Sequence, residues 1–482
     1  MFFNNLTTNK KDKPRINTPF MKWRNSSRII LLATLIALFT MLQFSQKWYH
    51  TINTVNMHGS NRVKFDADER LVHISELPGG MFKSTGHYHP HIYHISTAVI
   101  HNFEDIQEEI HKKFFDSMDE NKYRMNSPAM LWYKNELLVV LRIWLQNERH
   151  YDFKQVPHNL FQDNFLFCRR YDRSFKPLDR GTILGIPTPR YSSVADGPME
   201  PRMVKVKDDL LISFNAQIKL WHQQIVDTTL IWDYENYKAI LPIIKDGNPA
   251  MGAGINDEIP KDKHWMPFVI KDRLHYVYTL DPLRILECNV GANMSCWFIH
   301  RADKTPHGDV LWQDWDYFLR GGTPLSEYQW PYYIGFAHTA LYRVDNSRRY
   351  FTTNLFVLCV EPQYRLVYIS GKIEVSGQLL NRFRIIRPFV TSDPFIFAIS
   401  LILEDDDTAA LGVHINDKTG AILRMKGLKN LLEDVMLVDK REGTKEGPPP
   451  GEVQSFAIGS IEAQTGVMFQ RKTPKITRKF IG

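Results

Sequence analysis

Short apolar runs separated by tight polar turns dominate the chain between residues 131 and 415. In each copy, two apolar strands flank a turn rich in Lys, Asp or Asn, which is typical of a β-hairpin. The five copies are LWYKNELLVVL at 131–141, MVKVKDDLLISF at 203–214, PFVIKDRLHYVY at 267–278, ALYRVDNSRRYFTTNLFV at 340–357 and AISLILEDDDTAALGVHI at 398–415. Apolar positions at helical spacing predict flanking helices at 103–116 and 428–437. The pattern predicts a fold that is mainly all-β.

The hairpins recur at a nearly regular spacing. The turn residues Lys134, Lys207, Lys271, Asp345 and Asp405 are separated by 73, 64, 74 and 60 residues. Five hairpin-centred units of similar length are typical of a five-bladed β-propeller. We expect this propeller over residues 76–438, and a large β-sandwich with ordinary hairpins is the alternative.

The most apolar segment lies near the N-terminus. Residues 29–44 read IILLATLIALFTMLQF and carry no charge, and extension to Trp48 gives the about 20 residues that a helix needs to cross a bilayer. Seven basic residues and one acid precede it within residues 1–28, so the positive-inside rule places the N-terminus in the cytoplasm. We expect a type II membrane protein with a cytoplasmic tail (1–28), a signal-anchor transmembrane helix (29–48), a stem (49–75) and a luminal domain.

A cleavable signal peptide is the alternative for this apolar segment. The basic region ahead of it is long, and Gln43, Ser45 and Gln46 make a poor small-x-small cleavage site. These features favour an uncleaved anchor. The last segment, 439–482, falls outside the hairpin pattern, and its sequence leaves a closing strand and a disordered extension open.

The charge distribution excludes a nucleic-acid partner. The chain has 60 basic and 53 acidic residues, a formal net charge of +7, which by itself could indicate an acidic partner. The N-terminal tail holds most of the surplus, because 53 basic and 52 acidic residues remain after it. A nearly neutral domain has no electrostatic basis for binding nucleic acid.

Four cysteines are too few for a disulfide scaffold, and their spacing fits no zinc site. Cys288 and Cys296 bracket a seven-residue segment and are candidates for a small disulfide loop in an oxidising lumen. Within that loop, Asn293 begins the sequon Asn-Met-Ser and is a candidate for N-glycosylation.

Polar residues occur shortly before each hairpin turn, where the inner strand of each unit would begin. They are Asn126-Ser-Pro128, Glu200-Pro-Arg202, Lys263-His-Trp265, His338 and Asp393-Pro394. In a propeller these strand starts meet at one end of the central channel. They would therefore assemble one pocket from five distant parts of the chain.

Three of these groups carry side chains suited to sugar-phosphate chemistry. Glu200 can take or give a proton while Arg202 binds a hydroxyl or phosphate group, and a surface ion pair is the alternative. Lys263 and Trp265 combine a cation with an aromatic ring face, and a turn with a buried tryptophan is the alternative. His338 lies in the apolar run GFAHTALYR, where a core histidine with satisfied hydrogen bonds is the alternative.

Histidines offer two weaker signals. Alternate residues of one strand share a face and could hold a metal ion, as in the run His87, His89, His91 and His94. Pro90 interrupts this run and no acidic residue accompanies it, so we predict no metal site there. The segment GVHIND at 412–417 ends an apolar strand with polar side chains, and ordinary hairpin termination is the alternative to a binding role.

The Asp-x-Asp pattern of sugar-nucleotide transferases has little specificity in this sequence. This pattern holds a divalent cation on the donor diphosphate, and it occurs at Asp314-Trp-Asp316, at Asp66-Ala-Asp68 and at Asp405–Asp407. The chain also lacks the alternation of strands and helices that a nucleotide-binding α/β domain shows. We therefore predict no cofactor, and a requirement for Mn²⁺ or Mg²⁺ stays open.

Read in order, these motifs resemble the fungal β-mannosyltransferase family, Golgi type II proteins that add β-1,2-linked mannose to cell-wall mannan or to mannose-bearing glycolipid. The resemblance extends over residues 75–438 and is carried by GPMEPRMVKVKDDLLISFNAQ, KDKHWMPFVIKDRLHYVY, RGGTPL…YYIGFAHTALYR and SDPFIFAISL…LGVHINDK. A more distant resemblance is to the β-mannoside phosphorylases and related hydrolases, which are five-bladed propellers.

The resemblance implies roles for the matching residues. In the related phosphorylases a Glu-Asp-Pro-Arg motif carries the catalytic aspartate. Here Met199-Glu-Pro-Arg202 takes its place, so Glu200 stands in the catalytic position with one extra methylene group. The implied mannose-contacting residues are Asn126, Arg142, Arg202 and Asp417, and the implied phosphate-binding residues are Lys263, His338 and Arg343.

The family implies an inverting transferase in the Golgi lumen. It would move mannose from the α-linked donor GDP-mannose to an oligomannoside or mannosylated glycolipid acceptor. Inversion requires a base for the acceptor hydroxyl, for which Glu200 is the candidate, and cations beside the departing diphosphate. A β-mannoside phosphorylase or hydrolase on the same fold, with Asp417 or Asp393 as a second carboxylate, is the first alternative. A non-catalytic glycan-binding propeller is the second.

Overall fold

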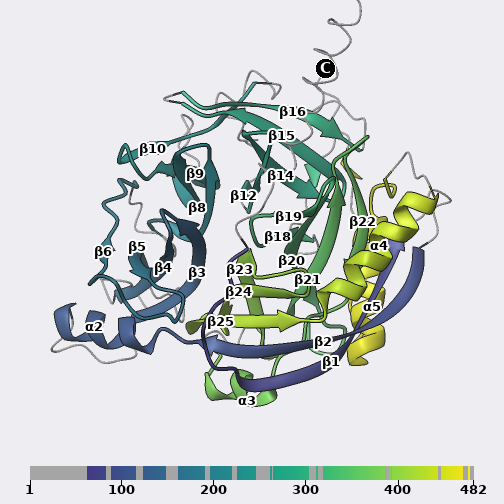
Figure 1. Ribbon diagram of the computed structural model, residues 1–482, viewed down its shortest axis with the longest axis horizontal. Helices are drawn as coiled ribbons and strands as arrows, with labels where there is room; N and C mark the ends of the chain where they lie inside the picture. Colours follow the sequence, from purple (N-terminus) through teal and green to yellow (C-terminus); the bar gives the residue numbers. More distant parts are fainter. Residues whose placement is uncertain are drawn as a thin grey trace, which may run out of the picture. The chain divides into compact units, whose positions relative to one another are not determined.

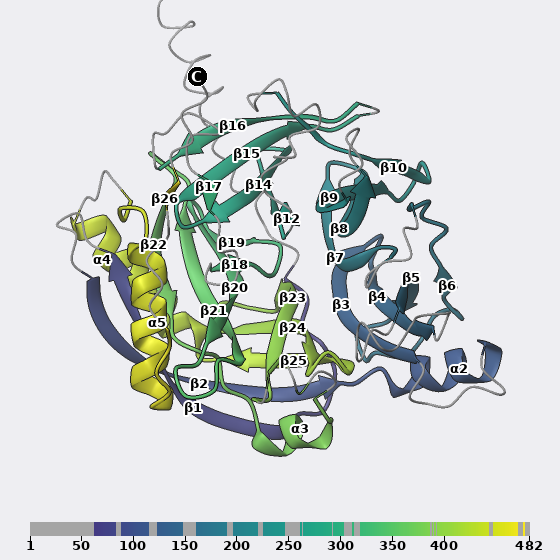
Figure 2. The same ribbon diagram turned by 180° about the vertical axis from the view of Figure 1, so that it is seen from behind.

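The chain consists mainly of antiparallel β-strands with a few helices, as the computed structural model shows (Figures 1 and 2). The predicted tail and signal anchor, together with His87, Lys263 and Asp314–Asp316, lie outside the residues that the structure describes. Within the described ranges, no helix is long and apolar enough to span a membrane. The described residues are 62–82, 88–114, 123–147, 161–189, 196–219, 225–245, 261–262, 264–291, 293–302, 311–312, 319–385, 388, 390–391, 393–442, 447–470 and 476–477.

The strands of the unit formed by residues 62–482 follow one another as antiparallel meanders. The meanders are β3 (Tyr123–Tyr133), β4 (Glu136–Asn147), β5 (Phe161–Tyr171) and β6 (Thr182–Ile183); β7 (Met199–Val206), β8 (Asp209–Lys219), β9 (Ile225–Asp233) and β10 (Lys238–Ile240); β13 (Met266–Ile270), β14 (Arg273–Leu280), β15 (Leu283–Asn289) and β16 (Ser295–Arg301); β20 (Tyr332–Tyr342), β21 (Arg349–Cys359) and β22 (Arg365–Ser370); and β23 (Ile396–Leu403), β24 (Thr408–Ile415) and β25 (Thr419–Lys426). Short strands beside them are β11 (Ile243–Ile244), β12 (Lys261–Asp262), β18 (Arg320–Gly321) and β19 (Ser326–Gln329), and β17 (Leu311–Trp312) pairs with β26 (Ile476–Thr477).

All five predicted hairpins are present. They are β3–β4, β7–β8, β13–β14, β20–β21 and β23–β24. Lys134, Lys207 and Lys271 have φ angles of 51°, 55° and 48° at three of the turns, and positive φ is what tight hairpin turns need to match the twist of their strands. The prediction of a mainly β fold is therefore confirmed.

Strands from different meanders lie beside one another (Figure 1). β3 contacts β7, β7 contacts β13, β14 contacts β18, β20 contacts β23, and β23 contacts β3. Apolar side chains fill the space between neighbouring sheets, as where Val140 of β4 and Ile212 of β8 share a buried core with Ile399 of β23. The contacts therefore pass from meander to meander and return to the first.

A long N-terminal hairpin joins the last two meanders. β1 (Arg70–Phe82) pairs with β22, and β2 (Tyr88–His101) pairs with both β1 and β25. β1 begins inside the range that the sequence assigns to a stem, and Phe65 just before it is buried.

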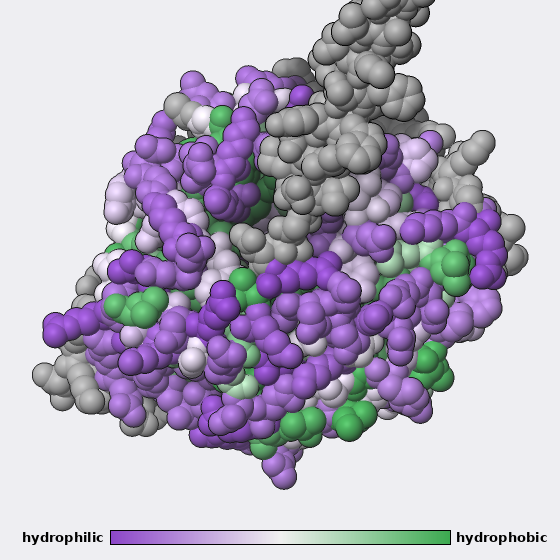
Figure 3. Space-filling view, in the orientation of Figure 1, coloured by the Kyte–Doolittle hydropathy of each residue, from purple (hydrophilic) through white to green (hydrophobic). Residues whose placement is uncertain are grey.

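The face of the molecule in Figure 3 is mainly hydrophilic and carries small hydrophobic patches.

The described helices are α2 (Glu104–Phe114), α3 (Gly377–Arg382), α4 (Leu428–Glu442) and α5 (Glu452–Thr465). The helices predicted at 103–116 and 428–437 are confirmed as α2 and α4. α5 lies in the segment left open between a strand and a disordered extension, and the structure makes it a packed helix. Its Phe456 ring lies so close to Gly80 of β1 that a β-carbon at Gly80 would come within 2.5 Å of it.

The cysteine loop lies between β15 and β16. Cys288 and Cys296 are opposite each other on these antiparallel strands, with Cα atoms 4.1 Å apart, and they form a disulfide. Asn293 is exposed in the connecting turn. The sequon therefore lies on the surface, where a glycan can be attached.

The N-terminus of α5 is capped by a carboxylate from a distant part of the chain. Asp281, between β14 and β15, is 4% exposed and accepts hydrogen bonds from the backbone N–H groups of Gly451 (2.6 Å) and Gln454 (2.8 Å). Burial raises the pKa of Asp281 to about 6, although the two backbone donors act in the opposite direction. The folded chain therefore binds a proton at this carboxyl more tightly than the unfolded chain does.

We expect the Asp281→Asn substitution to change how thermal stability depends on pH. Because the folded-state pKa of Asp281 is raised to about 6, its contribution to stability is complete below about pH 4 and is lost as the pH rises through about 6. An amide does not titrate. The melting temperature of the wild type, relative to the variant, should therefore rise as the pH is lowered from 7 to 4. A constant difference over this range would contradict the raised pKa.

Candidate active site

Glu200 stands at the start of β7 with its carboxylate held by two side chains. Asn215 Nδ2 donates a hydrogen bond of 2.7 Å to Glu200 Oε2, and His264 Nδ1 lies 3.0 Å from the same oxygen. Asn215 Oδ1 accepts the backbone N–H of His264 at 3.1 Å, so one amide ties both residues together. The side chain of Glu200 is 18% exposed and that of His264 is 5% exposed. Asn215 and His264 therefore orient the carboxylate, and its partial exposure leaves it accessible to a ligand.

The residues near the strand starts have a strained backbone, which sets the direction of their side chains. Ser127, Glu200 and His264 have φ angles of 53°, 50° and 72°, in the left-handed region that residues with a β-carbon seldom adopt. Strand pairing is irregular between Asn126 and Ala129 of β3, as it is at the start of β7. Such bulges turn a side chain away from the regular alternation of a strand and are frequent beside active sites.

Arg202 lies close to Glu200, and its hydrogen bonds connect β7 to the segment after β18. It is 1% exposed, and it donates hydrogen bonds to the backbone oxygens of Gly322 (2.5 Å) and Glu200 (3.0 Å). Burial lowers the pKa of Arg202 to about 10, so the guanidinium keeps its charge at neutral pH. The backbone of β18 also lies close to that of His264. This approach requires glycine, because a β-carbon at Gly321 would lie 2.1 Å from the His264 carbonyl oxygen.

His338 of β20 continues the cluster. Its ring centroid lies 5.1 Å from that of His264 and 4.0 Å from that of Phe397 on β23. Burial, followed by the charges of His264 and Arg320, holds the pKa of His338 well below its usual value, so the imidazole is neutral at neutral pH. Among the described residues, no group lies within hydrogen-bond reach of its buried Nδ1 atom. A buried polar atom of this kind is an open position for a hydrogen bond with a ligand or water.

Arg320 of β18 is the cross-strand neighbour of His338. Its charge lowers the pKa of His338, so the two side chains are close enough to interact electrostatically. The sequence motif RGGTPL contains Arg320, but nothing in the local pattern singles it out. The structure therefore adds a cation that the sequence pattern does not indicate.

Asp417 and Asn126 complete the chain of contacts. The Phe397 ring lies 4.9 Å from that of His414 on β24, and His414 Nδ1 lies 3.4 Å from Asp417 Oδ1. Asn126 Nδ2 donates a hydrogen bond of 2.8 Å to the Asp417 backbone oxygen. Arg142 is the cross-strand partner of Asn126 on β4 and donates through Nε to Asn164 Oδ1 at 2.7 Å. Residues from β3, β4, β7, β8, β18, β20, β23 and β24 thus meet in one cluster.

Most of the predicted site residues belong to this cluster. It contains Asn126, Arg142, Glu200, Arg202, His338 and Asp417. Lys263 lies outside the described residues, and its role stays a prediction. The structure brings together residues from the starts of β3 and β7 and from the segment just before β13, whereas His338 lies within β20 and not at its start.

Trp265 is a core residue and does not line the cluster, which corrects the prediction of an available ring face. It is 2% exposed, and its ring packs against those of Tyr276 (5.6 Å) and Tyr278 (5.3 Å) on β14. The two residues lie just before β13, and the Trp265 ring turns to the core while the His264 ring contacts Glu200 and His338. The alternative, a turn with a buried tryptophan, describes this segment.

Arg343 and Asp393 pair with each other. Arg343 NH1 lies 2.8 Å from Asp393 Oδ1, and its NH2 lies 2.5 Å from Asp345 Oδ2. The Arg343 guanidinium is therefore engaged by two carboxylates, and its role in the common pocket stays a prediction, as does that of Asp393. From the strand that follows Asp393, the Phe397 ring contacts His338.

Three residues of the cluster were not among the predicted site residues: His264, Asn215 and Phe397. His264 lies within the motif Lys263-His-Trp265, between two predicted residues. Asn215 occurs in the apolar strand LISFNAQ, where an amide needs a hydrogen-bond partner, and this was the available signal. Among the described residues, no group of three or more His, Cys, Asp or Glu could hold a metal ion.

Comparison with known proteins supports the resemblance over part of the chain. No protein-family model matches. Beta-mannosyltransferase 2 of Komagataella phaffii is 29% identical over 137 residues, and the same protein from a second strain matches equally. The match covers 27% of this chain and 18% of that relative, less than a fifth of its length.

Solved structures show only a loose likeness. A β-1,2-mannobiose phosphorylase from Listeria innocua has a TM-score of 0.40 and 13% identity, covering 66% of this chain and 94% of that one. A GDP-Man-dependent mannosyltransferase from Leishmania mexicana has a TM-score of 0.36 and 9% identity, covering 67% and 94%. A glycosyl hydrolase from Bacteroides ovatus has a TM-score of 0.38 and 9% identity, covering 62% and 83%. At these scores, the likenesses establish neither a common fold nor a common activity. What is shown is that part of this chain is distantly similar to a β-mannosyltransferase.

Proposed function

We propose that this protein is an inverting mannosyltransferase that moves mannose from GDP-mannose to a mannose-containing acceptor and forms a β-1,2-mannoside of cell-wall glycan or glycolipid. The observation that carries the proposal is the Glu200 carboxylate, held by Asn215 and His264 beside the open Nδ1 atom of His338. The similarity to beta-mannosyltransferase 2 over 137 residues supports the choice of mannose.

Glu200 acts as the base in this proposal. The donor is α-linked and the product β-linked, so the acceptor oxygen attacks the anomeric carbon from the face opposite the diphosphate. Glu200 takes the proton of the acceptor hydroxyl as the new C–O bond forms. The bond from the anomeric carbon to the diphosphate oxygen breaks, and GDP leaves with the electron pair. Asn126, Arg142 and Asp417 are the proposed contacts to mannose.

His338 and Arg320 are the proposed partners of the departing diphosphate. His338 is neutral because of its lowered pKa, so it would donate a hydrogen bond rather than supply a charge. Arg320, opposite it on β18, would supply the positive charge. Lys263 remains a proposed second cation, whereas Arg343 is engaged with Asp345 and Asp393.

We further propose that the meanders are the blades of a five-bladed β-propeller. Five hairpin units and the contacts that run from β3 through β7, β13, β18 and β23 back to β3 support this arrangement. The closing of the last blade by β2, which comes from the N-terminal part of the chain, is the strand exchange that a propeller uses to avoid an open edge.

The proposed location is the Golgi membrane, with residues 29–48 as the signal anchor and the β-rich unit in the lumen. The disulfide between Cys288 and Cys296 supports an oxidising compartment, because cytosolic proteins seldom keep one. An anchored enzyme in this compartment meets both GDP-mannose and glycan acceptors. Expression with a glycan-shift assay at Asn293 would test the orientation, and an unglycosylated chain in a competent host would contradict it.

The function is tested by one incubation. The full chain, solubilised in detergent, is mixed with GDP-mannose and short α-mannosides, and the products are analysed by NMR for a new β-linkage. We expect a β-1,2-mannoside and an equal amount of GDP. GDP-mannose that stays unconsumed with every α-mannoside, while the protein remains folded, would overturn the proposal.

A phosphorylase or hydrolase is the second candidate because the cluster contains another carboxylate. Asp417 lies 3.4 Å from His414 through its Oδ1 atom and is 18% exposed, and a hydrolase needs a second acid to position water. Loss of a β-1,2-mannobioside that depends on phosphate or water would support this candidate. Binding of mannosides without any turnover would instead indicate a glycan-binding protein.

We expect His264→Ala to lower kcat by about 10- to 100-fold, the loss typical of a hydrogen bond to a charged group. The acid limb of the pH–rate profile should move to higher pH, because the Nδ1 donor stabilises the ionised carboxylate of Glu200. His264→Asn keeps a donor near this position and tolerates the φ of 72°, so it should recover part of the rate. An unchanged acid limb in His264→Ala would show that His264 does not orient Glu200.

A further inference from the structure

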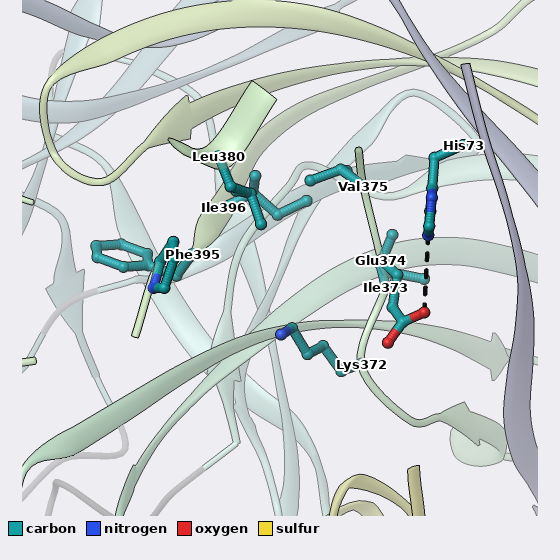
Figure 4. Close-up of a pocket in the computed structure, with 9 residues that line it drawn as sticks. His73, Lys372, Ile373, Glu374, Val375, Leu380, Phe395 and Ile396 are labelled. Carbon is teal, nitrogen blue, oxygen red and sulfur yellow. Dashed lines mark ion pairs between the residues drawn. The ribbon is translucent and has the colours of Figure 1, made fainter. Parts of the chain in front are cut away.

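A pocket of about 220 Å³ lies beside the cluster, between β1, the segment after β22 and the start of β23. Figure 4 shows His73 and Glu374 on one side and Phe395 and Ile396 on the other, with Lys372 below. The volume is under the roughly 300–1,000 Å³ of sites for drug-sized ligands. The pocket therefore suits a group the size of one sugar ring and is too small for a nucleotide.

The lining combines an apolar floor with a polar rim. Ile373, Val375 and Ile396 are buried, whereas the side chains of His73 and Glu374 are 33% and 36% exposed, with His73 Nε2 3.8 Å from Glu374 Oε2. A sugar ring likewise has apolar C–H faces and a hydroxyl edge. The opposite charges of Lys372 and Glu374 balance each other, so a neutral polyhydroxyl group fits better than a phosphate, which Glu374 would repel.

The walls of the pocket are fixed before any ligand arrives. Thr97 donates a hydrogen bond of 3.0 Å to the Glu374 backbone oxygen, and the Ile373 N–H donates 2.8 Å to the Thr353 oxygen. Lys372 Nζ donates 2.9 Å to the Tyr350 hydroxyl. Binding to a preformed site loses little conformational entropy.

The pocket adjoins the candidate active site through buried side chains. The Phe395 ring, which lines the pocket, lies 5.9 Å from the His414 ring, and His414 contacts Asp417. Thr353 contacts both the cluster and the pocket. It is the cross-strand partner of His338, and its hydroxyl donates a hydrogen bond of 2.8 Å to the Ile396 backbone oxygen. A glycan chain held at the cluster would therefore extend toward this pocket.

We propose that this pocket binds a further, neutral sugar residue of the acceptor glycan, so that the protein recognises an oligosaccharide rather than a single mannose. This inference rests on the proposed function. It assigns the specificity for acceptor length to His73, Lys372 and Glu374, which belong neither to the donor site nor to the reacting groups.

The test compares acceptors of different length. Glu374→Ala and, separately, Lys372→Met should lower kcat/KM for an α-mannotrioside by about fivefold to tenfold, the loss of one or two hydrogen bonds. For methyl α-mannoside, which is too short to reach the pocket, kcat/KM should stay within about twofold of the wild type. Lys372→Met removes the ammonium group with its contacts to Tyr350 and keeps the apolar part of the side chain, so no large void is left.

Glu235→Ala is the matched control. Glu235 is 40% exposed and is ion-paired with Lys134, like the carboxylate of Glu374 with His73, but it lines a different pocket at the β3–β4 turn. Glu235→Ala should leave kcat/KM unchanged for both acceptors. Equal losses for the long and the short acceptor in Glu374→Ala, or no loss for either, would overturn the inference.

The proposed function and this inference fail in different ways. If the wild type transfers mannose to no acceptor, the proposed function fails, and calorimetric binding still decides the pocket. In that case the trimannoside should bind the wild type more tightly than methyl α-mannoside, and Glu374→Ala should remove the difference. Equal affinities for the two mannosides would overturn the inference.

Discussion

Replacing Glu200 with Gln should lower kcat for mannose transfer by about 10²- to 10⁴-fold, the contribution typical of a positioned acid–base group. The amide has nearly the same shape as the carboxylate and keeps an oxygen to accept the hydrogen bond from Asn215 (2.7 Å). It cannot take the proton of the acceptor hydroxyl. The rate is measured as the formation of β-mannoside from GDP-mannose under saturating donor.

Glu235→Gln serves as the control for this substitution. It changes a carboxylate that is 40% exposed and paired with Lys134, at the opposite end of β3 from Asn126. The control should transfer mannose at the wild-type rate, and both variants should keep the wild-type circular dichroism and melting temperature. A folded Glu200→Gln protein with wild-type kcat would exclude Glu200 as the base.

Replacing Arg424 with Met should reduce the stability of the fold by about 3–5 kcal/mol, the cost of leaving a buried charge without its partner. Arg424 of β25 donates to both oxygens of Glu404, at 2.8 and 2.9 Å, and Glu404 has no exposed side-chain area. Arg424 also donates 2.6 Å to the Phe65 backbone oxygen. The pair therefore fastens the segment before β1 to the last meander, and the melting temperature reports its loss.

The double variant Arg424→Met, Glu404→Met separates the charge from the packing. Removing both members of a buried ion pair is often nearly neutral, because no unpaired charge remains. Its melting temperature should lie above that of the single variant but below that of the wild type, because the buried Phe65 backbone N–H and oxygen lose their partners. A double variant as unstable as Arg424→Met would mean that packing, and not the unpaired Glu404, accounts for the loss.

The hairpins were predictable because their determinants are local. A two-residue turn with positive φ, as at Lys134 and Asn135, needs only the turn residues and the apolar runs that flank it. α5 was not predictable in the same way. Its N-terminus depends on Asp281, which is 170 residues before Gly451, and no local pattern contains such a partner.

The candidate site was predictable as a set of polar residues but not as a geometry. Glu200 and His338 stood out because polar side chains in apolar runs need a reason to be there. Trp265 stood out equally, yet its ring lies in the core, because local sequence does not show which face of a strand meets the neighbouring sheet. The pairing of Arg343 was not predictable for a related reason, since its partner Asp393 lies 50 residues away in the sequence.

The sequence by itself determined the mainly β fold, the apolar segment at 29–44, the neutrality of the chain after the N-terminal tail and the polar character of the strand starts. These properties depend on residue type and on spacing along one stretch of chain. Only the tertiary structure decided that His264 and Asn215 hold Glu200, that Arg320 stands opposite His338, and that a sugar-sized pocket adjoins them. Each of these depends on contacts between strands that are far apart in sequence, and burial among those strands decides the pKa of His338.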